Sequence, residues 1–424
     1  MEGEHNKAEA AQKVEEEQRA GEEEQPQREC AVCLEKFGAD ALLSSHACDH
    51  ALCKTCWEKY LATEFDEKRK GFLDIVCPYP KCGQRLSDED WRKCASAKTL
   101  ENYEAVWKTV PEKATCFQDF NYAYDDHGVL RNTINGDKFH WVNQMHYDAL
   151  GDFIVEHIQN LLKKEHNMEE VILPLDVDNP DVPRTNIFLT PGALQAEKLI
   201  LLIQGSGAVR PGQWARALCI NDSLEVGTIF PYLRKCAERG WGVVVFNPNQ
   251  NAGTKPGADD DEAWFKTREA FLSTAKVMRP IKHLIKIPGS ETPSKHTTYV
   301  WDHFCAKAAA SRVAIIAHSA GGICTMDLLR ERGEEVMPRC VGVAFTDSVH
   351  WVSGRDPVPV RQFIKKNAVN WVKSNKPLDA PERGSGEDGC PCVSAGHPKH
   401  EWTSGCCVES VFKFLDDKFE AAQQ

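Results

Sequence analysis

Eight residues near the start of the chain have the types and spacing of metal ligands. Seven cysteines and one histidine form four close pairs, namely Cys30 and Cys33, Cys48 and His50, Cys53 and Cys56, and Cys77 and Cys82. A structural zinc site uses four sulfur or nitrogen donors in a tetrahedron, and a gap of two residues lets one turn present two thiolates to one ion. Eight donors therefore predict two closed zinc sites.

The order of the pairs predicts how the ligands are shared. If alternate pairs combine in a cross-braced arrangement, one ion is held by Cys30, Cys33, Cys53 and Cys56, and the other by Cys48, His50, Cys77 and Cys82. His46 lies close by but fits the spacing less well than His50. A segment this short has little core of its own, so metal binding is expected to supply part of its folding free energy.

A second set of residues has the pattern of a nucleophilic serine. The sequence VAIIAHSAGG at 313–322 predicts a strand, a sharp turn at Ser319 and the start of a helix. Such a turn exposes the serine oxygen at the end of a strand, and it needs small neighbours such as Ala320 and Gly321. Ala317 replaces the first glycine of the usual G-x-S-x-G pattern.

The partners that a catalytic serine needs follow later in the chain. Asp347 ends an apolar segment and His400 comes after it, which is the order expected of an acid and a base in α/β-hydrolases. Asp379 or Asp388 could replace Asp347, and His350 or His397 could replace His400. The N–H groups of Ser206 or Gly207 and of Ala320 are the candidates for an oxyanion hole. A serine at such a turn can also serve packing alone.

The elements that position these residues alternate between apolar and amphipathic segments. Strands are expected at 171–175, 187–190, 198–203, 242–247, 313–318 and 341–346. Helices are expected at 145–164, 227–239, 298–310, 322–332 and 360–373. This alternation predicts a doubly wound, mostly parallel sheet covered by helices on both faces.

The domain organisation follows from shifts in composition. We expect a disordered acidic tail at 1–27, a zinc module at 28–90, a helical linker at 91–114 and an α/β domain at 115–424. A segment at 250–296, rich in proline, aspartate and lysine, is expected to be a surface insertion with a helix at 262–277.

Composition limits the classes of function. The 424 residues are 42% hydrophobic and 27% charged with a net charge of −12, which does not favour a nucleic-acid surface. No apolar segment approaches the roughly 20 residues that cross a bilayer, and no secretory leader is recognised. The 18 cysteines are therefore expected to be reduced thiols or metal ligands, in the cytoplasm or the nucleus. Four of them, Cys390, Cys392, Cys406 and Cys407, could bind a third metal or be redox-active, but more simply are free thiols.

The cysteine-rich segments CAVCLEKF, CDHALCKTCWEKYL and CPYPKCGQRL resemble the first RING of the RING-in-between-RING ubiquitin ligases. The resemblance implies an apolar face that docks a ubiquitin-conjugating enzyme, at the positions of Val32, Trp57 or Tyr60, and Pro78. No further zinc pairs follow Cys82, so a ligase of this kind would position a charged conjugating enzyme without a thioester of its own.

The larger domain resembles the Argonaute-binding-protein-two family, also called the cotranscriptional regulator family. The matching motifs include FNYAYDDHGVLR, LLIQGSGAVRPGQWAR, WGVVVFNPNQN, IIAHSAGG and VSAGHPKHEWTS. The resemblance implies an α/β-hydrolase-like fold and gene-silencing partners, such as Argonaute or chromatin and RNA-processing proteins. Gln204 stands where relatives usually have a histidine.

Three hypotheses follow from these motifs. The first is a RING-type ubiquitin ligase whose larger domain binds a substrate or partner, and it is preferred because its zinc ligands are complete. The second is a serine hydrolase that uses Ser319, His400 and Asp347. The third is a non-catalytic gene-silencing scaffold.

Overall fold

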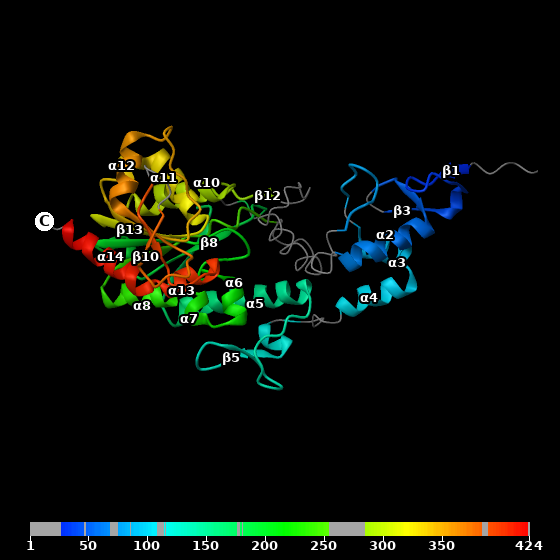
Figure 1. Ribbon diagram of the computed structural model, residues 1–424, viewed down its shortest axis with the longest axis horizontal. Helices are drawn as coiled ribbons and strands as arrows, with labels where there is room; N and C mark the ends of the chain where they lie inside the picture. Colours follow the sequence, from blue (N-terminus) through cyan, green and yellow to red (C-terminus); the bar gives the residue numbers. More distant parts are fainter. Residues whose placement is uncertain are drawn as a thin grey trace, which may run out of the picture. The chain divides into compact units, whose positions relative to one another are not determined.

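The computed structural model describes residues 27–45, 48–67, 75–84, 86–107, 114, 116–175, 179, 181–253, 285–383 and 389–422. The chain divides into two compact units, 1–113 with 141–147, and 114–140 with 148–424 (Figure 1). The expected tail, apart from Gln27, and the expected helix at 262–277 lie outside the described residues. The two units are considered separately below.

The described residues of the first unit form two small hairpins and three α-helices. Its strands are β1 (Gln27–Glu29), β2 (Lys36–Gly38), β3 (Leu42–Ser44) and β4 (Ala51–Cys53), and its helices are α2 (Lys54–Glu67), α3 (Asp88–Cys94) and α4 (Ala97–Trp107). β1 pairs with β2 and β3 with β4, both antiparallel. The small core includes Trp57 and Leu61, and Trp91 stacks on Tyr103 at 4.6 Å between ring centroids.

Two helices occupy the region where a single linking helix was expected. A capping box starts α3, since the Ser87 Oγ accepts a hydrogen bond from the Asp90 N–H and the Asp90 carboxylate accepts one from the Ser87 N–H. Ala95 then adopts an extended conformation, with φ −76° and ψ 154°, so α3 ends there. The described part of the expected helical linker is therefore divided into two helices.

The second unit alternates strands and helices. Its strands are β5 (Tyr122–Tyr124), β6 (Leu130–Asn132), β7 (Glu169–Leu173), β8 (Thr185–Leu189), β9 (Lys198–Ile203), β10 (Gly242–Val245), β11 (Ala252–Gly253), β12 (Ile285–Lys286), β13 (Arg312–His318), β14 (Cys340–Thr346), β15 (Ala368–Val372), β16 (Pro381–Glu382) and β17 (Cys392–Ser394). Its helices are α5 (Gln144–Lys164), α6 (Arg216–Asn221), α7 (Leu224–Gly227), α8 (Phe230–Glu238), α10 (Pro293–Val300), α11 (Gly321–Val336), α12 (Val358–Asn367), α13 (Thr403–Cys406) and α14 (Val408–Ala421).

Nine of these strands form one mixed, mostly parallel sheet in the order β16-β17-β15-β14-β13-β9-β10-β8-β7. The pairings from β10 through β9, β13, β14 and β15 to β17 are parallel, and those of β8, β7 and β16 are antiparallel. Helices α10, α11 and α12 cover one face, and α8 and α14 cover the other (Figure 1). Because both faces are covered, central strands such as β9, KLILLI, are almost wholly apolar. This arrangement confirms the predicted fold class.

Most predicted elements differ from the observed ones by only a few residues, but the helix expected at 360–373 was wrong in its last third. Helix α12 ends at Asn367, and Ala368–Val372 forms β15 between β14 and β17. The sequence AVNWV is compatible with a helix or a strand, because a pattern of five residues does not distinguish the two. It forms a strand here because it pairs with β14 and β17 and buries Trp371 in the sheet. The helix expected at 298–310 also begins earlier, at Pro293, and continues as a π-helical turn over Trp301–Cys305.

None of the described helices combines the length and the apolar character that a membrane-spanning segment needs.

Candidate functional site

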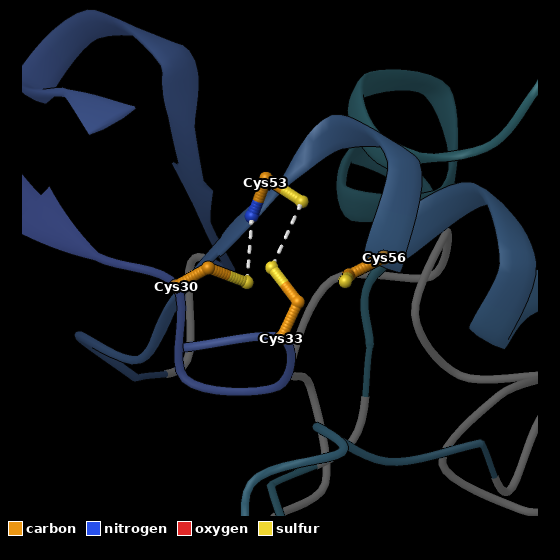
Figure 2. Close-up of side chains that lie close together, drawn as sticks. All are labelled: Cys30, Cys33, Cys53 and Cys56. Atoms are coloured by element: carbon orange, nitrogen blue, oxygen red, sulfur yellow. Dashed lines mark hydrogen bonds between the residues drawn. The ribbon is translucent and has the colours of Figure 1, made fainter. Parts of the chain in front are cut away.

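Two groups of ligand atoms gather in the first unit. The sulfur atoms of Cys30, Cys33, Cys53 and Cys56 all lie within 4.8 Å of one another (Figure 2). The first pair comes from the turn after β1, and the second comes from the end of β4 and the first turn of α2. The Cys53 N–H donates to the Cys30 sulfur at 3.3 Å, and the Cys33 and Cys53 sulfur atoms are 3.9 Å apart. This is the geometry of four donors around one ion.

The second group consists of Cys48, His50, Cys77 and Cys82, whose ligand atoms also lie within 4.8 Å of one another. The Cys77 sulfur is 3.9 Å from the Nδ1 atom of His50, and the His50 ring stacks on Tyr79 at 3.9 Å between centroids. Both groups therefore combine alternate pairs, as the order of the ligands predicts. Within the described residues, they are the only groups of three or more such side chains that could hold a metal ion.

Thiols packed this closely do not ionise together without a cation. Burial, together with the neighbouring thiol of Cys53, raises the pKa of Cys56 to about 12. Burial and the Cys48 thiol likewise raise the pKa of Cys77 to about 12. A divalent cation removes this repulsion, and it favours the thiolate forms that serve as ligands.

The four residues expected to dock a conjugating enzyme differ in exposure. Val32 is 51% exposed and Pro78 is half-buried. Tyr60 is also half-buried, and its hydroxyl donates to the Val76 carbonyl at 2.6 Å. Trp57 is fully buried and donates from Nε1 to the Leu43 carbonyl at 2.7 Å, so its proposed place in an exposed face is wrong. An indole packed inside so small a core contributes to folding instead.

In the second unit, Ser319 occupies the sharp turn between β13 and α11. Its φ of +51° is in the left-handed region, which residues other than glycine adopt only at a cost in backbone strain. The Ser319 N–H donates to the Thr346 carbonyl at 3.1 Å, and the Ser319 carbonyl accepts from the Val349 N–H at 3.2 Å. The turn is therefore held by the last residue of β14 and by the segment that follows this strand.

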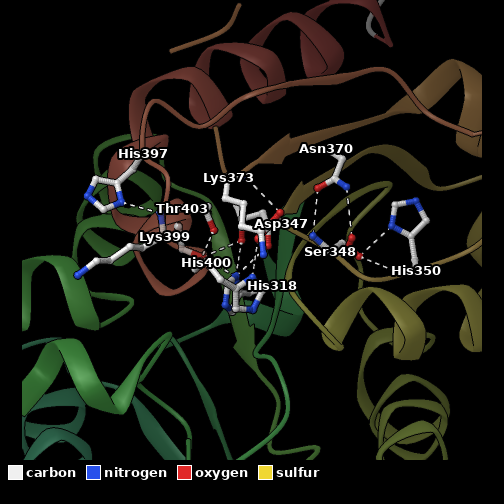
Figure 3. A network of polar contacts seen from close by, with 12 residues as sticks. His318, Asp347, Ser348, His350, Asn370, Lys373, His397, Lys399, His400 and Thr403 are labelled. Carbon is white, nitrogen blue, oxygen red and sulfur yellow. Dashed lines mark hydrogen bonds and ion pairs between the residues drawn. The ribbon is translucent and has the colours of Figure 1, made fainter. Parts of the chain in front are cut away.

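Asp347 and His400 come together next to His318, the residue that precedes Ser319 (Figure 3). The Asp347 Oδ2 and the His400 Nδ1 are 2.6 Å apart. The Lys373 N–H donates to the other carboxylate oxygen at 3.1 Å. Burial opposes ionisation of Asp347, but these two contacts outweigh it and lower the pKa of the carboxyl group. A carboxylate bound to Nδ1 leaves Nε2 of the imidazole as the atom that could accept a proton.

The alternative acids and bases have other partners. Asp379 accepts from the Trp371 indole at 2.8 Å and from the Ser410 hydroxyl at 2.6 Å, and Asp388 lies outside the described residues. His397 accepts a hydrogen bond from the Lys399 N–H (Figure 3). Its ring stacks on Trp402. His350 is buried, with Nδ1 2.8 Å from the Ser348 hydroxyl and Nε2 3.8 Å from the Cys390 sulfur. Among these candidates, and within the part of the chain that the structure describes, only Asp347 and His400 form an acid–base pair.

His318, which precedes the serine, is a further titratable group that the sequence pattern did not single out. Its Nδ1 lies 2.8 Å from the Thr346 carbonyl, so this nitrogen carries the proton and donates. The His318 and His400 rings are 4.8 Å apart between centroids. Burial, with a smaller contribution from His400, lowers the pKa of His318 to about 4. His318 is therefore a neutral imidazole packed against His400. In the sequence, its position directly before Ser319 was the one feature that could have marked it as part of the site.

The turn expected to supply the oxyanion hole lies against Ser319. A Cβ atom placed on Gly205 would come within 2.8 Å of the Ser319 Cβ, so Ser206 and Gly207 directly follow a residue in contact with the serine. Ala320 lies on the other side, as the residue before α11. The structure has no hydrogen bond between the Ser319 hydroxyl and His400. Hydrogen bonds between a catalytic serine and its base are often long or poorly aligned without substrate, and they tighten when substrate binds.

Cys390, Cys392, Cys406 and Cys407 do not form a third group of ligand atoms that all lie within 4.8 Å of one another, as the two N-terminal groups do. Cys390, Cys392 and Cys407 are buried and Cys406 is half-buried.

The model of the Arb2 domain matches residues 113–378 of this chain, which is more than half of its length. The chain belongs to the Arb2 family.

Similarity to known proteins agrees with this assignment. The chain is 36% identical to the "Cotranscriptional regulator ARB2A homolog" of Xenopus tropicalis over 338 residues, which cover 72% of this chain and 80% of the relative. It is 36% identical to the human "Cotranscriptional regulator ARB2A" and 38% identical to the Dictyostelium discoideum homolog, with 72% and 70% of this chain and 80% and 78% of the relatives covered.

The cysteine-rich region has a separate likeness. A stretch of 79 residues, 19% of this chain, is 32% identical to 14% of the Arabidopsis thaliana "Probable E3 ubiquitin-protein ligase ARI8". This Arb2 protein therefore carries an N-terminal region that weakly resembles the RING of that protein, as the sequence motifs indicated.

Solved structures similar to the Arb2 domain include histone deacetylases and esterases. The histone deacetylase Clr3 has a TM-score of 0.41 at 14% identity, with 64% of this chain and 39% of that one covered. A histone deacetylase from Saccharomyces cerevisiae has a TM-score of 0.39 at 14% identity, covering 66% of this chain and 100% of that one. The bacterial brefeldin A esterase has a TM-score of 0.29 at 12% identity, covering 64% and 85%.

Proposed function

We propose that this Arb2 protein is a cotranscriptional regulator whose N-terminal module binds two Zn²⁺ ions and recruits a ubiquitin-conjugating enzyme. The observation that carries the proposal is the gathering of eight ligand atoms into two tetrads made from alternate pairs. Sets of four thiolates, or three thiolates and one imidazole, are the donors of closed structural zinc sites. Zinc would supply no chemistry here beyond holding the two loops that contain Val32 and Pro78.

The proposed docking face consists of Val32 and Pro78, with Tyr60 at its edge. Exposed apolar side chains on a small module are costly unless a partner covers them. Leu34, next to the first cluster, is 67% exposed, and Tyr79, next to Pro78, is 41% exposed. These two residues extend the apolar face beyond the positions that the sequence motif suggested. The name of the similar Arabidopsis protein, a probable E3 ubiquitin-protein ligase, supports a ubiquitin-conjugating enzyme as the occupant.

The larger domain is proposed to bind gene-silencing partners, such as Argonaute or chromatin and RNA-processing proteins. The names of the ARB2A relatives support this part, and they favour a regulatory scaffold over an enzyme. We propose that such a protein acts in the cytoplasm or the nucleus. Co-precipitation of the full chain, followed by mass spectrometry, tests whether proteins of these classes are enriched over a tag-only control.

A ubiquitination assay with zinc-loaded full-length protein and a panel of conjugating enzymes tests the ligase function. We expect chains to form, and we expect Val32→Ala to abolish them. Val358→Ala is the matched control because Val358 is 52% exposed, much like Val32, but lies in the Arb2 domain. If no conjugating enzyme yields chains while both zinc ions are bound, the ligase function is wrong and the scaffold remains.

A second candidate function is ester hydrolysis at Ser319. Two observations favour it, namely the positive φ of Ser319 at the strand–helix turn and the 2.6 Å contact between Asp347 and His400. In this reaction His400 would accept the Ser319 proton, the serine oxygen would attack the ester carbonyl, and the proton would pass to the leaving alkoxide, which leaves an acyl group on Ser319. His400 would then accept a proton from a water that attacks this acyl group, and return it to the Ser319 oxygen as the carboxylic acid is released. Labelling with a fluorophosphonate probe tests it. Uptake by the wild-type chain and not by Ser319→Ala is expected, and equal labelling of the two would refute it.

A further inference from the structure

One buried side chain holds the turn that faces Ser319. Asn249 is 3% exposed and belongs to the segment after β10. Its side-chain nitrogen donates to the Gly205 carbonyl at 2.6 Å and to the Val209 carbonyl at 3.2 Å. Carbonyl oxygens only accept hydrogen bonds, so both contacts require the amide nitrogen of Asn249. Asn249 therefore clamps the two ends of the turn 205–209.

The sheet brings the clamp and the serine to the same edge. β10, β9 and β13 are adjacent parallel strands, and Asn249, Gly205 and Ser319 follow their respective carboxyl ends. In an open α/β sheet this edge is where ligands bind. Three neighbouring strands thus deliver the clamp, the turn and the candidate nucleophile together.

The clamp has a consequence for the direction of one backbone donor. In a trans peptide, the carbonyl of one residue and the N–H of the next lie in one plane and point in opposite directions. Because the Gly205 carbonyl is bound to Asn249, the Ser206 N–H is directed away from Asn249. Gly205 itself is packed so closely on Ser319 that a Cβ atom at this position would come within 2.8 Å of the Ser319 Cβ.

The segment that contains Asn249 is itself held in place. The Asn247 N–H donates to the His296 Nε2 at 2.9 Å, and the Asn251 side chain donates to the Ser290 carbonyl at 2.8 Å. Asn247, Asn251 and His296 are all buried. Because its segment is anchored, Asn249 loses little conformational freedom when its side chain binds the turn 205–209, so it holds this turn more firmly than a donor on a free loop would.

We infer that Asn249 is a positioning residue that orients the Ser206 N–H as an oxyanion donor, opposite the N–H of Ala320. The inference rests on the proposed hydrolase function of Ser319. Nothing in the motif that contains Asn249, FNPNQN, indicated such a role from the sequence, because the asparagine lies 70 residues from the serine and acts only through another segment.

The test is Asn249→Asp, which keeps the size of the side chain but turns a carboxylate oxygen toward two carbonyl oxygens. Removing one oxyanion donor lowers kcat by roughly 10²–10³-fold, so displacement of one should cost about 10- to 100-fold. The readouts are kcat and KM for a p-nitrophenyl ester and the rate of fluorophosphonate labelling. We expect kcat and labelling to fall while KM changes little.

Asn251→Asp is the matched control. Asn251 is buried in the same segment and also donates to a backbone carbonyl, but that carbonyl is Ser290, and no contact joins it to the Gly205 turn. Both variants are expected to lower the melting temperature, whereas only Asn249→Asp should slow labelling. Amide hydrogen exchange of a peptide spanning 204–209 should rise only in Asn249→Asp.

The outcomes separate the two ideas. If the wild-type chain shows no labelling that depends on Ser319, the hydrolase function is wrong, and the oxyanion role of the turn is wrong with it. If the wild-type chain is labelled and Asn249→Asp is labelled at the same rate, the hydrolase function stands and the role of Asn249 is overturned. Equal slowing in both asparagine variants would also overturn it, because a general loss of stability would then explain the effect.

Discussion

Cys53→Ser should release one zinc ion and unfold the N-terminal module. Cys53 is buried, and its sulfur lies 3.9 Å from that of Cys33 in the first cluster. A serine hydroxyl does not replace a thiolate as a ligand at neutral pH, since it stays protonated. The first tetrad would be left with three donors.

The magnitude follows from comparing the metal with the core. Structural zinc contributes apparent free energies of about 10–16 kcal/mol in zinc-finger peptides. A whole domain has a net stability of about 5–15 kcal/mol. The module has few large buried side chains, chiefly Trp57, Leu61, Trp91 and Tyr103. Losing most of one zinc site should therefore exceed the net stability of the module.

Zinc analysis and hydrogen exchange measure the result. Metal content should fall below two ions per chain, and peptides from α2 and α3 should lose protection. Peptides from β13 provide an internal reference. Cys94→Ala is the control variant, because Cys94 is fully buried in the same unit but belongs to neither cluster. It should cost about 1 kcal/mol, as typical single substitutions do, and keep both ions.

The reasoning is refuted if Cys53→Ser retains two tightly bound ions, or if α2 and α3 stay protected after one ion is lost. The first result would mean that Cys53 is not a ligand of either ion, and that the first tetrad is not the metal site proposed here. The second would mean that the core alone holds the module, contrary to its small size.

Three further predictions concern the Arb2 domain. Gly205→Ala should slow Ser319 labelling at least about tenfold, because its Cβ would lie 2.8 Å from the Ser319 Cβ, and Gly354→Ala, where a Cβ meets open space, should leave the rate unchanged. The folded-state pKa of Asp347 is lowered, so its contribution to stability is present above the unfolded value of about 3.9 and is lost as pH falls through the folded value. In urea unfolding from pH 6 to pH 3, the stability difference between the wild-type chain and Asp347→Asn should therefore shrink below about pH 4, and a difference independent of pH would contradict this assignment. Arg239→Lys should lower stability by about 1–2 kcal/mol in thermal unfolding, because it removes the paired contacts to Asp416 at 2.8 and 2.9 Å and the stacking on Phe412. An unchanged melting temperature would show that the paired contacts between Arg239 and Asp416 do not stabilise the domain.

The metal clusters show how far spacing alone can reach. Pairs of cysteines that share one turn must lie close together, whatever the rest of the chain does, so the ligand sets could be assigned from their order along the chain. The role of Trp57 could not, because an aromatic residue just after a ligand fits an exposed face and a small core equally well. Only the packing around α2 decides that its indole is buried.

The serine site divides in the same way. Short-range sequence marks the turn at Ser319, since a strand, small residues and a serine must be neighbours to form it. Asp347 could be preferred to Asp379 because it ends an apolar segment, but the order of serine, acid and histidine fits either acid and either histidine. The fold distinguishes them by contacts that join segments far apart in the sequence.

Alternating apolar segments were sufficient to predict a mostly parallel sheet, because only burial on both faces tolerates strands such as KLILLI. They were not sufficient at 368–372, where an apolar segment follows a helix directly and either period fits. The position of β15 between β14 and β17, and the clamp of Asn249 on the Gly205 turn, depend on which strands become neighbours. Sequence determines which elements can form, and the long-range packing of the sheet decides which side chains meet, because that choice is made by burial and hydrogen bonding between distant segments.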